Sequence, residues 1–233
     1  MSDREHNYFG LRADENRKVL IFTELKAEGV EHQSWGSKPT QDLLRIQPEN
    51  DADSAHLDWL IEQSNEAKQK GFFSKAAELM HQAYHFSQAL NDLDDTIYYY
   101  GLAGHFHQVA LLLKIWDEVS FDKAHRFSRL AGEAVKFMDE QNVNDADLEG
   151  LINIAMSILR QNHFSITPKQ IEIDFLADES SRWFHYGIPL HESVIVAKLV
   201  EMDFELAERS VDECPLQIIR GGFVPMFEVV GEE

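Results

Sequence analysis

The residues in this sequence with the widest chemical range are its histidines, of which there are eleven among 233 residues. His81 and His85 are four positions apart, the spacing at which two imidazoles on one helix can bind one metal ion, and His105 and His107 follow them. Glutamine follows His81, so the His-Glu-x-x-His motif of zinc proteases is absent. Apolar neighbours would face the core and turn both imidazoles toward solvent or the next layer. The pattern favours no metal and no cofactor.

A second set of possible ligands lies near the end of the sequence and consists of His185, His191 and Cys214. These residues fall on a predicted strand, a helix start and a loop, and no pattern brings them together. The sequence contains no Gly-x-Ser-x-Gly elbow, and the segment 101–104 lacks the Lys-Ser/Thr of a phosphate-binding loop. No catalytic residues are therefore assigned, and a metal-dependent hydrolase is the third of three functional hypotheses.

Charge is the most unusual property of the composition, because 41 acidic and 21 basic side chains give a net charge of −20. Residues 166–233 alone carry 14 acidic and 5 basic side chains. Such a field repels nucleic acid and anionic lipid and favours encounter with basic partners. No apolar run approaches the roughly 18 residues that a membrane helix needs, no signal peptide is visible, and the one cysteine cannot form an internal disulfide. A cytoplasmic protein is expected.

Two groups of residues could contact a protein partner. Three consecutive tyrosines, Tyr98 to Tyr100, would splay around a helix, so at least one ring should be exposed or lie at an interface. The other group is an acidic run in the last long predicted helix, where one-sign charge would attract a basic protein. Its members are Glu201, Asp203, Glu205 and Glu208.

The elements that must position these residues are mostly helices. Residues 54–164 contain no proline, and apolar residues recur there at three- and four-residue spacings, which predicts about six helices joined by short links. The last of them is expected from Leu148 to Leu159, with Asn144 and Asp145 as cap candidates. In the first fifty residues a helix starting near Asp14 and a strand over residues 19–22 are both compatible with the pattern.

The period changes after Pro168. Residues 171–175 alternate as a half-buried strand does, and residues 183–188 form a second candidate strand. A helix is expected from about His191 to Ser210, with Val194, Ala197, Val200, Phe204 and Ala207 on one face. Residues 216–220 and 223–230 flank a Gly-Gly pair, which predicts a hairpin, and Pro225 should place the last strand at a sheet edge. The predicted C-terminal order is ββαββ.

Part of the helical region follows a repeated pattern. Gly71 is followed by Phe73, Ala76, Met80 and Ala83, and Gly104 is followed at the same offsets by Phe106, Val109, Leu113 and Trp116. Over about residues 60–116 this resembles the tetratricopeptide repeat, in which a glycine closes the first helix of each hairpin. The resemblance implies a groove for a peptide or a partner helix. It would be lined by Asp58, Ile61, Asn65 and Lys68 from the first unit and by Asp94 and Tyr98 from the second.

The sequence thus predicts a mostly helical α+β protein with three parts. Residues 1–53 form a segment whose secondary structure the pattern does not decide, residues 54–165 form a repeat-like helical domain, and residues 166–233 form a small ββαββ domain. The leading hypothesis is a non-catalytic interaction module that binds a basic partner, or one presenting a peptide or helix, through the groove, the acidic surface or both. The alternative is an acidic inhibitor, of the immunity-protein or DNA-mimic type, that neutralises a basic nuclease or DNA-binding protein. Oligomeric state stays open.

Overall fold

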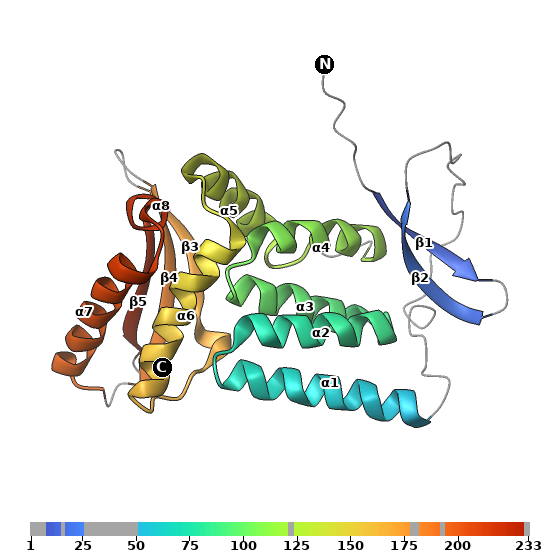
Figure 1. Cartoon of the computed structure of the whole chain (residues 1–233), viewed down its shortest axis with the longest axis horizontal. Helices are drawn as coiled ribbons and strands as arrows, with labels where there is room; N and C mark the ends of the chain where they lie inside the picture. Colours follow the sequence, from blue (N-terminus) through green and yellow to red (C-terminus); the bar gives the residue numbers. More distant parts are fainter. Residues whose placement is uncertain are drawn as a thin grey trace, which may run out of the picture.

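The computed structural model of the chain describes residues 8–14, 17–25, 51–120, 124–177, 182–191 and 194–230. These residues form eight α-helices, one short 3-10 helix and five strands (Figure 1). Two strands precede the helices, and the other three form a small sheet near the end of the chain. The mostly helical α+β class predicted from the sequence is confirmed.

The first two strands settle the choice that the sequence left open near the start of the chain. Strands β1 (Tyr8–Asp14) and β2 (Arg17–Leu25) pair antiparallel. The apolar run at residues 19–22 therefore belongs to a strand and not to a helix.

Six helices lie between residues 51 and 161, as the spacing of apolar residues predicts. Their bounds are α1 (Asp51–Gln69), α2 (Phe73–Ser87), α3 (Leu90–Leu102), α4 (Phe106–Val119), α5 (Ser128–Gln141) and α6 (Asp145–Gln161). Each of the first four packs on the next in sequence, and α6 runs across the direction of α1 to α4 (Figure 1). The apolar spacing predicts the fifth helix from Phe121 to Met138, whereas α5 begins at Ser128, and residues 121–123 lie outside the described residues.

The two glycines of the repeated pattern close two equivalent turns. Gly71 between α1 and α2 has φ +72°, and Gly104 between α3 and α4 has φ +82°, the left-handed region that favours glycine. In both turns the amide of the residue after the glycine donates to the carbonyl five residues before that donor, at 2.9 Å. This is the Schellman arrangement of a helix end. The two hairpins thus have the same closing geometry.

Helix α6 packs against both turns. A β-carbon on Gly104 would lie 2.8 Å from Leu148 Cγ and from Ile152 Cδ1, so glycine is needed for close approach as well as for φ. Asn144 caps α6, accepting from Asp147 N at 3.0 Å, while Asp147 accepts from Asn144 N at 3.0 Å. The predicted cap is confirmed, and it fixes where the crossing helix begins.

The C-terminal sheet has the order β3-β4-β5, with β3 (Glu172–Ala177) antiparallel and β5 (Phe223–Val230) parallel to β4 (Arg182–His191). The connection contains α7 (Val196–Glu213) and α8 (Leu216–Arg220). The predicted strand over 216–220 is therefore wrong, and the order is ββααβ. A parallel pair requires a crossover, which α7 supplies, and a five-residue segment with three apolar residues does not distinguish a strand from one turn of helix.

The end of β4 also differs from the prediction, because Pro189 lies within the strand and α7 begins only at Val196. β3 pairs with β4 no further than Gly187, so Pro189 faces a sheet neighbour on one side only and its missing N–H costs little. Pro225 lies in β5, at the edge of the sheet, as predicted.

One hydrophobic core contains buried residues of both the helical part and the sheet. Aromatic side chains join the two: the ring of Phe184 in β4 lies 5.4 Å from that of Phe106 in α4 and 5.8 Å from that of Phe223 in β5. Phe137 of α5 contacts Phe223 at 5.2 Å. The division at residue 166 into two domains stays a prediction.

Candidate functional site

Helix α7 lies at the outer edge of the molecule and packs on α6 and β5 (Figure 1). Its buried side is made by Met202, Leu206 and Ser210. Two polar side chains flank this side: Arg209 donates to Ser157 Oγ of α6 at 2.7 Å, and Asp203 accepts from Phe227 N of β5 at 3.4 Å. The rotation of α7 about its axis is therefore fixed from both sides.

Of the apolar face predicted for this helix, only Val194, which precedes α7, is buried, and the four residues that lie on α7 are exposed. Residues spaced by three and four positions along α7 form a continuous exposed row, which we call the stripe. It consists of Val196, Val200, Phe204, Ala207 and Val211. Phe204 is 73% exposed and Val196 72%, so the largest apolar side chain of the helix projects into solvent. Isolated exposed apolar residues need no explanation, but a continuous row along a helix does.

Acidic side chains form a second row on α7, beside the stripe and on the side away from Asp203 at the usual 100° per residue. We call it the ridge, and its members are Glu201, Glu205, Glu208 and Asp212. Lys198 lies 3.0 Å from Glu201, and Arg209 lies 3.9 Å from Glu205. Among the described residues no cation forms an ion pair with Glu208 or Asp212. The ridge thus keeps unbalanced negative charge next to an apolar surface.

Asp203 does not belong to this ridge, although the sequence placed it with the acidic run. Its carboxylate is half-buried between α7 and β5, where burial raises its pKa and the hydrogen bond from Phe227 N opposes that effect. By satisfying an outward-facing amide, it also protects the free edge of β5. Its function here is structural.

Two of the groove residues expected on α1, Asn65 and Lys68, contact each other and helix α3. Lys68 Nζ donates to Asn65 Oδ1 at 3.0 Å and to Tyr99 Oη at 2.7 Å, which ties α1 to α3. Burial lowers the pKa of Lys68, and nearby Asp95 opposes that shift. The cation that a peptide carboxylate would need is thus already hydrogen-bonded within the chain.

The α3 side of the expected groove is covered by the chain itself. Tyr98 Oη donates to the carbonyl of Pro168 in the 3-10 helix η2 (Pro168–Gln170) at 2.7 Å, and Arg126 lies 3.8 Å from the centre of its ring. Asp94 lies 2.8 Å from His125 Nε2. None of the three tyrosines 98–100 is exposed: Pro168 and Arg126 cover Tyr98, whereas Tyr99 and Tyr100 are buried against α1 and α2.

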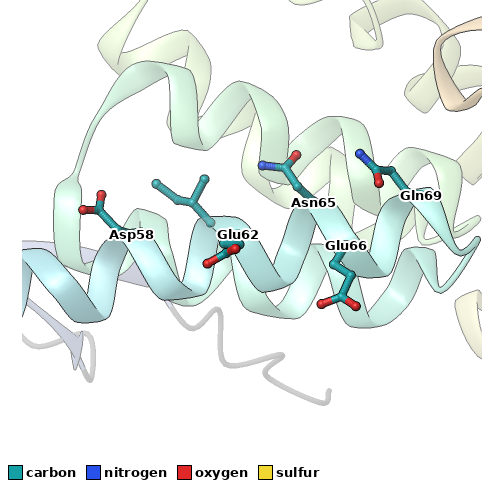
Figure 2. Close-up of a pocket in the computed structure, with 6 residues that line it drawn as sticks. Asp58, Glu62, Asn65, Glu66 and Gln69 are labelled. Carbon is teal, nitrogen blue, oxygen red and sulfur yellow. The ribbon is translucent and has the colours of Figure 1, made fainter.

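The α1 side is open but shallow. Figure 2 shows the depression there, with a volume of about 500 Å³, on one face of a single helix. Its lining consists of Asp58, Ile61, Glu62, Asn65, Glu66 and Gln69. Three of the predicted groove residues, Asp58, Ile61 and Asn65, thus line this depression, whereas Lys68, Asp94 and Tyr98 do not.

Four of the histidines considered as metal ligands, His81, His85, His105 and His185, contact other side chains of the chain. The rings of His81 and His85 stack at 4.7 Å, and burial, followed by the neighbouring His85, lowers the pKa of His81 to about 4. His105 Nε2 lies 2.9 Å from Glu149 Oε2, and His185 Nε2 lies 2.9 Å from Glu228 Oε1. Within the described ranges no three His, Cys, Asp or Glu side chains form a group suited to hold a metal ion, and this includes the set of His185, His191 and Cys214.

The stripe is the feature that sequence reasoning missed. The helical period indicates an apolar face on residues 194–207, and this face was expected to be buried in the core. A signal was present, since Met202 and Leu206 form a second apolar face on the same helix. One helix at the molecular edge cannot bury both.

No helix of the described residues is both long and apolar enough to cross a membrane. Comparison with protein-family models, curated proteins and solved structures finds no match for this chain. Function is therefore inferred from the residues and their geometry.

Proposed function

We propose that this protein is a non-catalytic, cytoplasmic interaction module whose docking surface is the stripe and the ridge of α7. The observation that supports it is the concentration of exposed apolar side chains. Nine of the thirteen large hydrophobic residues exposed among the described residues lie between positions 195 and 226. Continuous apolar surface beside polar residues is typical of protein–protein contact sites.

The groove of the helical stack is the weaker candidate for the same function. The equivalent glycine turns support a repeat-like stack of two hairpins, of the tetratricopeptide kind. However, Lys68 and Tyr98 would have to exchange hydrogen bonds with Tyr99 and Pro168 before they could bind a peptide. The stripe of α7 needs no such exchange, because its side chains already face solvent.

The alternative function, an inhibitor that imitates a nucleic-acid backbone, would use the ridge alone. Carboxylates would then carry the binding, and replacement of Phe204 would change little. The stripe favours a mixed apolar and electrostatic contact instead, because exposure of Phe204 is costly in a surface that works by charge alone.

The proposal can be tested by placing a photo-crosslinking phenylalanine analogue at Phe204 in the full chain, expressed in its native host. A crosslinked protein is expected that is absent when the analogue replaces Leu111, a residue 53% exposed on α4. The captured protein, once purified, should bind the unmodified chain at 1:1 stoichiometry in calorimetry and should lose that binding on Val200→Asp. Equal crosslinking at both positions, or binding that tolerates Val200→Asp, would refute α7 as the docking surface.

A further inference from the structure

Resting on the function proposed above, we propose that the docking surface of α7 binds an amphipathic basic helix of a partner protein. Stripe and ridge run side by side along the same helix, from residue 196 to residue 212. At about 1.5 Å rise per residue this is a straight contact of roughly 24 Å, or about 16 residues of a partner helix. Extended partners instead pair through backbone groups, and Asp203 already occupies one such group at the edge of β5.

The stripe supplies the packing part of the contact. Its residues repeat at intervals of four and three, so their side chains form a raised apolar row that fits the grooves of a second helix. Phe204 is its central residue and the most exposed, at 73%. A partner helix would receive that ring as a knob between its own side chains, as in helix-in-groove recognition.

The ridge selects the charge of the partner. Glu201 lies 3.0 Å from Lys198, and Glu205 lies 3.9 Å from Arg209, which also binds Glu213 at 2.7 Å and Ser157 at 2.7 Å. Glu208 and Asp212 have no ion pair within the described part of the chain. Lysine or arginine along one flank of a partner helix would meet these carboxylates while its apolar face covers the stripe.

A second copy of this chain is the obvious competitor, and the charges oppose it. Two α7 helices that packed antiparallel about a two-fold axis through Phe204 would bring ridge against ridge, because a two-fold contact joins each surface to itself. Eight acidic side chains would then line one side of the contact between two chains that carry −20 each. A basic helix removes that repulsion, which is why it is the occupant proposed.

The test uses the full chain and three fluorescent synthetic peptides of about 16 residues, the length of the contact at 1.5 Å per residue. The first has leucine on one helical face and lysine on the other. The second has glutamate in place of lysine, and the third has the composition of the first in an order without a continuous apolar face. Anisotropy titrations at low salt and at about 0.3 M salt measure the affinities, because exposed charges are screened at the higher value.

The first peptide should bind at least about tenfold more tightly than the other two, the difference expected of a contact that needs both anchor and charge. Phe204→Ser should weaken its binding at least about tenfold, as an interface anchor does, whereas the matched Leu111→Ser should not. The double variant Glu208→Lys, Asp212→Lys should weaken binding and flatten its salt dependence.

Two results would overturn the inference yet leave α7 as the docking surface. One is equal binding of the lysine and glutamate peptides that is still sensitive to Phe204→Ser. The other is a dimer in light scattering that Phe204→Ser dissociates, which would assign the surface to a second copy. Peptide binding that is indifferent to Phe204→Ser would overturn both the inference and the docking surface on which it rests.

Discussion

Tyr186 of β4 donates a hydrogen bond of 2.8 Å from its hydroxyl to the carbonyl oxygen of Leu102, at the last residue of α3. The ring of Tyr186 is 1% exposed, so this bond lies inside the core that the sheet and the helices share. It satisfies a carbonyl at a helix end, where no intrahelical donor is present.

Tyr186→Phe should therefore destabilise the protein by about 1 to 2 kcal/mol, because it leaves a buried carbonyl without a donor. Urea denaturation followed by circular dichroism would measure this as a lower midpoint with an unchanged slope. An unchanged midpoint would mean that water replaces the hydroxyl and that the sheet packs less tightly against α3 than the structure shows.

Replacement of glycine by alanine should have opposite effects on stability in a turn and inside a helix. Gly104→Ala should cost about 1 to 2 kcal/mol for the left-handed φ and more for the overlap with Leu148 and Ile152. Gly132→Ala, inside α5 with no atom within 4 Å of the new β-carbon, should stabilise by up to about 1 kcal/mol. Thermal melts of the two variants give the comparison, and a loss of stability at both positions would contradict the placement of α5.

The orientation of α7 can be tested with two residues that are only two positions apart. Met202→Ala should cost about 2 to 5 kcal/mol, because Met202 is 0% exposed and its loss leaves a cavity. Phe204→Ala should change stability by no more than about 0.5 kcal/mol, as expected for an exposed side chain. Denaturant midpoints of the pair report the result, and the reverse order would place the stripe in the core.

His81 predicts a pH dependence of stability. Because burial, and secondarily His85, lower its pKa to about 4, the native state keeps His81 neutral at pH values where the unfolded chain already binds a proton. Above a pH of about 6.5 His81 is neutral in both states, so its protonation does not change the free energy of unfolding. Between about pH 6.5 and 4 the protonation of His81 in the unfolded chain lowers the free energy of unfolding, by up to about 3 kcal/mol.

His81→Gln should therefore be destabilising at neutral pH, where it only loses packing and the contact with Tyr100 Oη, and progressively less so as the pH falls toward 4. Urea midpoints of both proteins across this range give the difference, which serves as its own control for other titrating groups. A difference that stays constant with pH would show that the imidazole is accessible to protons in the native state.

The helical part was largely predictable because its signals are local. Proline is absent from residues 54–164, the apolar spacing is that of helices, and Gly71, Gly104 and Asn144 mark ends that depend only on nearby backbone. The same glycines also revealed the equivalence of the two hairpins. Local backbone geometry is encoded by neighbouring residues, so a single sequence is sufficient for it.

The C-terminal sheet shows where such signals end. Residues 216–220 have a pattern compatible with a strand or a short helix, and Gly221 and Gly222 are compatible with a hairpin or with the end of α8. Parallel pairing of β5 with β4 excluded the hairpin, and pairing between residues 39 positions apart is not encoded locally.

For the candidate site, the sequence by itself predicted an acidic, amphipathic helix from about His191 to Ser210, and the helical period places Glu201, Glu205 and Glu208 on one side of it. Only the tertiary structure decided which of two apolar faces is buried. Docking on α6 and β5, fixed by the bonds of Arg209 to Ser157 and of Asp203 to Phe227, buries Met202 and leaves the stripe exposed. Helical period sets which residues share a face, but the partner that a face meets depends on distant parts of the chain.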